Sequence, residues 1–184
     1  SYNQAASLFE LKDYRKSLNA YRDFLKKFPS HEYAGFAMTR VGELLEILGA
    51  DKTRVMGAYL ETYFRYGDSP SAIVARLRML SSRMNGMKDK EVEKAVSEIG
   101  ELSKLSNLPG IEQFSTVMIS EGFDKRKEFD KSIDKLVKYY QEHPLDSDTK
   151  MLARRIVKSI NSKISTLTDS GQFIQALQTH NQYA

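Results

Sequence analysis

The sequence predicts an all-α protein, a solenoid of about eight to ten helices arranged as stacked antiparallel hairpins. Three observations predict this fold. Apolar residues recur at steps of three and four, one helical segment repeats without gaps, and proline or glycine follows the predicted helices. Of the 184 residues, 41% are hydrophobic, 28% are charged and only four are proline, which is typical of a folded chain and not of a disordered one.

The clearest helix is predicted over residues 13–28. Its large apolar residues follow helical spacing and line one face: Tyr14, Leu18, Tyr21, Leu25 and Phe28. Pro29 ends this helix, because proline lacks the amide donor that a further turn needs and disfavours helical angles in the residue before it. An amphipathic helix of this kind cannot bury its apolar stripe alone, so it must pack against neighbouring helices.

This helix recurs along the chain. Residues 13–29 match residues 128–144 without gaps at a constant offset of 115, and Pro144 falls at the position of Pro29. A third copy covers residues 172–183, and a weaker copy is predicted over residues 58–67, where Ala58 and Tyr59 take the places of Ala20 and Tyr21. The repetition indicates a protein assembled from similar helical units.

A partner helix follows each proline. Apolar patterns over residues 33–48 and 151–160 predict these helices, and Gly49 and Gly171 stand where glycine ends a helix. Residues 85–110 fit the pattern poorly and are predicted to form a divergent connecting hairpin. We expect residues 1–184 to form a single superhelical domain and to be a fragment of a longer chain.

Four residues carry a family resemblance. Tyr14, Ser17, Leu18 and Pro29 resemble the second helix of a tetratricopeptide repeat (TPR), and Gly42 and Gly49 resemble that family's glycines. Residues 24–34, followed by residues 41–43, are also similar to repeats in bacterial envelope proteins, of the outer-membrane-assembly lipoprotein and cell-division coordinator kind. The resemblance implies a right-handed solenoid with a concave groove that binds another protein or a peptide.

Projecting the family's inward positions onto this chain nominates two sets of partner-binding residues. The first set is Phe36, Thr39, Glu43 and Glu46, and the second is Met151, Arg154, Lys158 and Asn161. The first is acidic and the second basic, so one groove holding both would orient a bound peptide. Charged residues on helices are most often simply solvated, which is the plainer interpretation of any one of them. Tyr33 and Phe123 fall near helix ends, where such a groove opens.

Two predicted helices are rich in basic residues. One carries Arg76, Arg78 and Arg83, and the other carries Lys150, Arg154, Arg155, Lys158 and Lys163 with no acid from 149 to 168. Such stripes could meet an acidic protein, anionic lipid head groups or a nucleic-acid backbone. A nucleic-acid partner is the less expected, because the formal net charge is only +4 and no nucleic-acid motif accompanies the stripes.

The sequence does not predict an enzyme. It has no cysteine, and its three histidines lack the spacing of a helical metal site, so we expect no metal or other cofactor. It also lacks a phosphate-binding glycine loop, a serine elbow and a dinucleotide motif, and no small-molecule substrate is expected.

The last helix leads to two further expectations. Its apolar stripe, Ile174, Leu177 and Tyr183, has no following helix in this sequence, which predicts pairing with a second copy or with further sequence. No stretch is long and apolar enough to span a membrane, so a membrane association is expected only through sequence not shown. The resemblance favours the periplasm or cell envelope, with the cytoplasm as the alternative.

Overall fold

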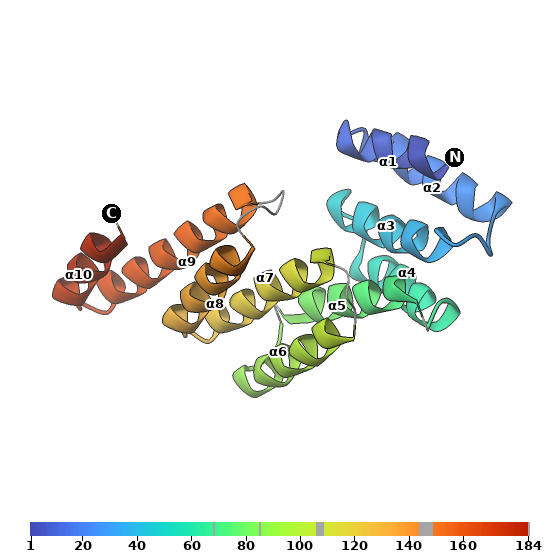
Figure 1. Cartoon of the computed structure of the whole chain (residues 1–184). Coiled ribbons are helices and arrows are strands. Elements are labelled where there is room, and N and C mark those ends of the chain that lie inside the picture. Colours follow the sequence, from blue (N-terminus) through green and yellow to red (C-terminus); the bar gives the residue numbers. More distant parts are fainter. Residues whose placement is uncertain (68, 85, 106–108, 144–148, 184) are drawn as a thin grey trace. The chain divides into compact units, whose positions relative to one another are not determined.

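The computed structural model describes residues 1–67, 69–84, 86–105, 109–143 and 149–183 (Figure 1). Over these residues the chain consists of ten α-helices without strands, which confirms the all-α prediction. In chain order the helices are α1 (Tyr2–Glu10), α2 (Tyr14–Lys27), α3 (Ala34–Ile47), α4 (Lys52–Arg65), α5 (Pro70–Met84), α6 (Asp89–Lys104), α7 (Pro109–Lys125), α8 (Phe129–Glu142), α9 (Thr149–Asp169) and α10 (Phe173–Tyr183).

Consecutive helices pack as antiparallel hairpins. The pairs α1–α2, α3–α4, α7–α8 and α9–α10 are in contact, and the contacts α2–α3, α6–α7 and α8–α9 join one hairpin to the next (Figure 1). The contacts divide the chain into two compact units, Ser1–Ser82 and Arg83–Ala184, which are described separately. The single superhelical domain stays a prediction. In the segment predicted to diverge, α6 is a regular helix whose first turn is capped by Glu91.

The repeat seen in the sequence is also a repeat in burial. Ser17 and Ser132, which are 115 positions apart, are both fully buried, and Leu18 and Ile133 are 8% and 1% exposed. Small side chains at the first position let helices approach closely, and the larger residue that follows fills the space between them. The gap-free alignment therefore identifies residues with the same structural role.

The turn before the second helix of a hairpin has a conserved geometry within the chain. Lys12 and Lys127 have φ angles of 60° and 59°. Gly171, which takes the corresponding position before the third copy of the repeat, has a φ of 76°. A left-handed residue reverses the chain between the two helices, and a lysine there is disfavoured by about 1 kcal/mol. In the first turn Asp13 then caps α2 by accepting a hydrogen bond from the Lys16 backbone N–H, and the Lys16 side chain, through its own hydrogen bond, lowers the pKa of Asp13.

Gly42 brings α3 and α4 into close contact. A Cβ atom at Gly42 would lie 2.5 Å from Cε1 of Tyr59, which is itself fully buried. The same device recurs in the second unit, where a Cβ atom at Gly122 of α7 would lie 2.2 Å from a methyl group of Val96 in α6. Glycine is therefore required at both positions by packing and not by a turn.

Candidate protein-binding surfaces

The first set of predicted partner-binding residues lies on α3, in the unit of residues 1–82, and its members differ in exposure; we call it the α3 set. Phe36 and Glu43 are half-buried and Glu46 is exposed. Thr39 is only 4% exposed, and its hydroxyl donates to the carbonyl oxygens of Gly35 at 3.0 Å and Ser71 at 3.4 Å. This packing role replaces the partner contact predicted for Thr39, because a side chain buried between helices offers no surface to a ligand.

Glu43 is the centre of an ion-pair network on α3. Its carboxylate lies 2.5 Å from Nη1 of Arg40 and 2.8 Å from Nη2 of Arg78, which comes from α5. Burial alone would lower the pKa of the Arg40 guanidinium, but Glu43 overrides this and raises it. Arg40 also lies over the ring of Phe9 on α1, at 4.8 Å. The charge of Glu43 is thus neutralised within the unit, and Arg78 is not the free surface cation that the sequence predicts.

Glu46 lies one turn further along α3 and contacts α4. One of its carboxylate oxygens accepts a hydrogen bond from the Tyr59 hydroxyl at 3.3 Å. Burial raises the pKa of Tyr59, because its phenolate would be deprived of water, so the hydroxyl stays protonated and can donate. Glu46 nevertheless remains exposed and keeps acceptor capacity for a ligand.

In the unit of residues 83–184, Arg155 of α9 turns inward. Its side chain is 10% exposed, and Nη2 lies 2.8 Å from Oδ2 of Asp124 on α7. The same carboxylate oxygen accepts from the Ser159 hydroxyl at 2.9 Å, and Glu121 lies 3.5 Å from Nη1. Arg155 therefore belongs to a largely buried polar network that joins α7 to α9. Its assignment to a free basic patch is corrected for that reason.

Some of the remaining basic-patch residues also interact with side chains of neighbouring helices. Lys163 is 20% exposed and lies 2.6 Å from Asp130 of α8. Arg76 is half-buried, and its guanidinium lies 5.9 Å from the ring centroid of Tyr63. Arg83 is exposed. The side chain of Lys150 lies outside the described residues. Acids of neighbouring helices thus neutralise much of a stripe that carries no acid of its own.

The outer face of α9 is open. Its residues line a shallow groove of about 600 Å³, which includes Arg154, Lys158 and Asn161 of the predicted set together with Val157, which is 55% exposed. At about 100° per residue, Arg154 lies about 100° around α9 from Arg155, and Lys158 lies about 60° from it, so both lie to one side of the face that packs against α7. Among the described residues no carboxylate pairs with Arg154 or Lys158. Met151 is 38% exposed but does not line the groove.

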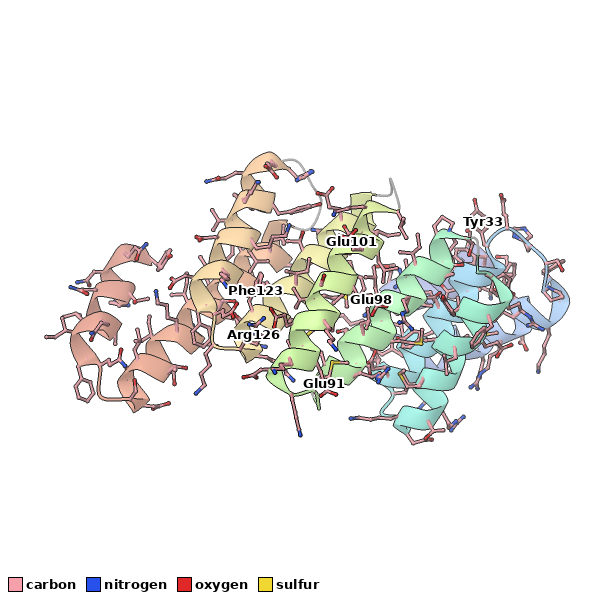
Figure 2. The ribbon with its side chains drawn as sticks, turned by 90° about the horizontal axis from the view of Figure 1, so that it is seen from below. Tyr33, Glu91, Glu98, Glu101, Phe123 and Arg126 are labelled. Atoms are coloured by element: carbon pink, nitrogen blue, oxygen red, sulfur yellow. The ribbon has the colours of Figure 1, made fainter. Side chains whose placement is uncertain are left out.

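The two aromatic residues near helix ends differ in their packing. Tyr33 is 44% exposed, and its ring lies 5.1 Å from that of Tyr2. Phe123 is half-buried on α7, beside Arg126 in Figure 2, with the Lys131 ammonium 6.0 Å from its ring. Figure 2 also shows Glu91, Glu98 and Glu101 along α6. Tyr33 retains exposed aromatic surface, whereas Phe123 serves mainly to pack its own unit.

A second groove was not predicted from the sequence. It lies within residues 1–82, with α2 and α4 as its walls and α3 as its floor, and we call it the α2–α4 groove. One signal could have revealed it, because basic or polar residues follow helical spacing along one side of α2: Arg15, Asn19, Arg22 and Lys26.

The apolar stripe on α10 is uncovered. Leu177 is 60% exposed, although its equivalents Leu18 and Ile133 are 8% and 1% exposed. Ile174 is 73% exposed and Tyr183 is 38% exposed. In α2 and α8 a following helix covers the corresponding face, so the stripe on α10 has the character of a surface that packs against another helix.

Two classes of site are not found in the described part of the chain. No three or more His, Asp or Glu side chains gather there as a metal site would require. None of the helices in that part combines the length and the apolar character needed to cross a bilayer.

The fold is similar to that of known TPR-like repeats. The TPR-like repeats of a kinesin light chain from Podosopora anserina share it at a TM-score of 0.59 and 10% identity, with 98% of this chain and 90% of that chain covered. A single-residue variant of the same repeats gives the same values. No protein-family model matches the chain, and no curated protein matches it. The likeness confirms the TPR-like architecture, and the narrower resemblance to envelope proteins stays a prediction.

Proposed function

We propose that this chain is a non-catalytic scaffold that binds another protein or a peptide through the open face of α9. Its TPR-like repeat fold is one that generally serves protein interaction. Solenoids suit this role because each repeat contacts only its neighbours and leaves long faces of its helices accessible. A fold alone does not identify a site, so the proposal depends on the side chains of α9.

One observation carries the proposal, namely the division of the basic residues of α9. Arg155 and Lys163 are held by carboxylates of α7 and α8, whereas Arg154 and Lys158 lie on the open side of α9 and pair with no acid among the described residues. The unpaired cations flank the exposed side chain of Val157. A surface that combines apolar area with uncompensated positive charge fits a segment with an apolar anchor and carboxylates beside it.

The wider setting is a further part of the proposal. The envelope-protein resemblance of residues 24–34 and 41–43 supports a place in a bacterial envelope or motility assembly, in the periplasm or cell envelope, with the cytoplasm as the alternative. A single concave groove that joins the α3 set to the α9 set stays a prediction. Phe36 and Glu46 are the members of the α3 set that remain available for a protein contact, because Thr39 is buried and Glu43 is paired with two arginines.

A second candidate is binding to an anionic surface, either lipid head groups or nucleic acid. The absence of any acid among the described residues that line the α9 groove favours it. Salt separates the two candidates, because binding that depends only on phosphate contacts weakens steeply as salt rises, whereas an apolar anchor keeps part of its affinity.

The test uses a displayed library of random 12-residue peptides selected on the whole chain. We expect selected peptides to lose at least about tenfold in affinity for Arg154→Glu/Lys158→Glu, since two attractive charge contacts become repulsive. The matched control, Lys94→Glu/Lys135→Glu, changes the net charge equally at exposed positions of α6 and α8 and should bind as the wild type does. Failure to select any peptide, or equal binding by both variants, would refute the assignment to α9.

The exposed stripe of α10 supports a second contact, which we propose is made with another copy of the chain. Ile174 and Leu177 would pack against the same residues of the second copy, because a twofold pairing places identical patches face to face. A chain that stays monomeric at high concentration in light scattering would contradict this pairing.

A further inference from the structure

The α2–α4 groove combines an apolar floor with a basic rim. Two adjoining hollows of about 340 Å³ and 460 Å³ share Arg22, Leu45 and Arg54, so they form one continuous groove. Apolar side chains of α3, among them Leu45, form its floor, and Leu18 and Leu25 of α2 extend the apolar surface along one wall. The cations of its rim are Arg15, Arg22, Lys26 and Arg54.

The rim cations form no ion pair within the described part of the chain. Among the described residues no carboxylate pairs with Arg15, Arg22, Lys26 or Arg54, whereas Arg40 and Arg78 in the same unit are both paired. Glu61, the acid among the residues that line the groove, lies 3.2 Å from Arg65. The groove therefore carries a positive charge that is not used to hold the unit together.

The repeat does not require this charge. At the positions of α8 that correspond to Arg15, Asn19, Arg22 and Lys26 of α2, 115 residues later, acidic or neutral side chains stand instead. They are, in chain order, Asp130, Asp134, Val137 and Gln141. Because α8 buries the same core positions as α2 without a basic rim, the rim is a local property of α2 and not a consequence of the fold.

Gly57 provides an independent indication. It lies in the interior of α4 and lines the groove, yet a Cβ atom there would meet nothing within 4 Å. Packing therefore requires glycine at Gly42 but not at Gly57. Glycine in the interior of a helix is also unfavourable by helix propensity. A glycine that is costly to the free helix and leaves open space in a groove is suited to the close approach of a ligand.

We propose that the α2–α4 groove binds an acidic amphipathic helix of a partner protein. The rim runs along α2 from Arg15 to Lys26, which is about 17 Å or three turns of helix. A bound helix of that length would place apolar residues on the floor beside Leu45 and carboxylates against Arg22 and Arg54. The apolar floor favours such a helix over a nucleic-acid backbone, which would use the cations alone. This surface is distinct from the open face of α9.

The probe is a displayed library of 15-residue helix-forming peptides, with Glu at the flanking positions and randomised apolar residues along one face. Selection on the whole chain is followed by fluorescence anisotropy of the enriched peptides. We expect Arg22→Glu/Arg54→Glu to weaken binding at least tenfold. We expect Gly57→Gln, which places a helix-forming side chain in the groove, to weaken binding at least tenfold as well.

Two controls separate this site from α9. The selection is run on Arg154→Glu/Lys158→Glu, so that the face of α9 cannot enrich acidic peptides, and Lys94→Glu/Lys135→Glu should bind the enriched peptides as the wild type does with an equal change in net charge. Circular dichroism of each variant shows whether it is folded. The proposal is overturned if no acidic peptide is enriched, or if the enriched peptides tolerate both Arg22→Glu/Arg54→Glu and Gly57→Gln. It is overturned equally if duplex DNA or anionic vesicles bind through Arg22 and Arg54 while the peptides do not.

Discussion

Neighbouring arginines on α9 offer a direct comparison of a structural cation with a free one. We expect Arg155→Met to lower the free energy of unfolding by about 3 kcal/mol, because breaking a buried ion pair leaves an uncompensated charge. The value is at the low end of the usual range, since Asp124 keeps the hydrogen bond from Ser159 and its side chain is 14% exposed. Arg154→Met should cost less than about 0.5 kcal/mol, because Arg154 is exposed.

Urea denaturation followed by circular dichroism measures both variants with the same substitution on the same helix. The double variant Asp124→Asn/Arg155→Met should be less destabilised than the sum of the two single variants, because the two residues interact directly. A cost below about 1 kcal/mol for Arg155→Met would refute the buried network. It would also return Arg155 to the basic patch that the sequence predicts.

Three further predictions concern packing, association and pH. Gly42→Ala should lower stability by about 1–3 kcal/mol, because the new methyl group meets the buried ring of Tyr59, and a thermal midpoint equal to that of the wild type would contradict this. Leu177→Gln should convert a dimer to a monomer in light scattering, and an unchanged mass would exclude α10 as the contact. Burial raises the pKa of Tyr21 to about 12, so the folded state holds this proton more tightly than the unfolded chain, and the stability gained is lost as pH rises above about 10 towards 12. Urea midpoints of Tyr21→Phe should therefore fall less than those of the wild type between about pH 9.5 and 11, and parallel curves would contradict the assignment.

The sequence predicts the repeat well because the signal lies within one helix. Tyr14, Leu18 and Tyr21 fall on one face whatever the helix packs against, and the same face is buried in α8 at an offset of 115. The left-handed turn was predictable at Gly171 but not at Lys12 or Lys127, because lysine rarely adopts that conformation. Only the alignment of the three copies reveals that these residues are equivalent.

The binding residues were harder to predict because their environment comes from other helices. Arg154 and Arg155 are adjacent and identical in type, yet one is open and the other is held by Asp124, which lies 31 residues earlier in the chain. Thr39 was assigned to the partner-binding set for the same reason, because the carbonyl oxygen of Ser71 on α5, which accepts a hydrogen bond from its hydroxyl, is remote in the sequence. The α2–α4 groove draws its lining from three helices, and no single segment of the sequence displays it.

The most direct test of the scaffold function is the affinity of library-selected peptides for Arg154→Glu/Lys158→Glu, measured by isothermal titration calorimetry beside the wild type and Lys94→Glu/Lys135→Glu. Protein binding through the open face of α9 predicts a loss of at least about tenfold in the first variant and none in the second. Equal affinities in all three proteins would contradict it.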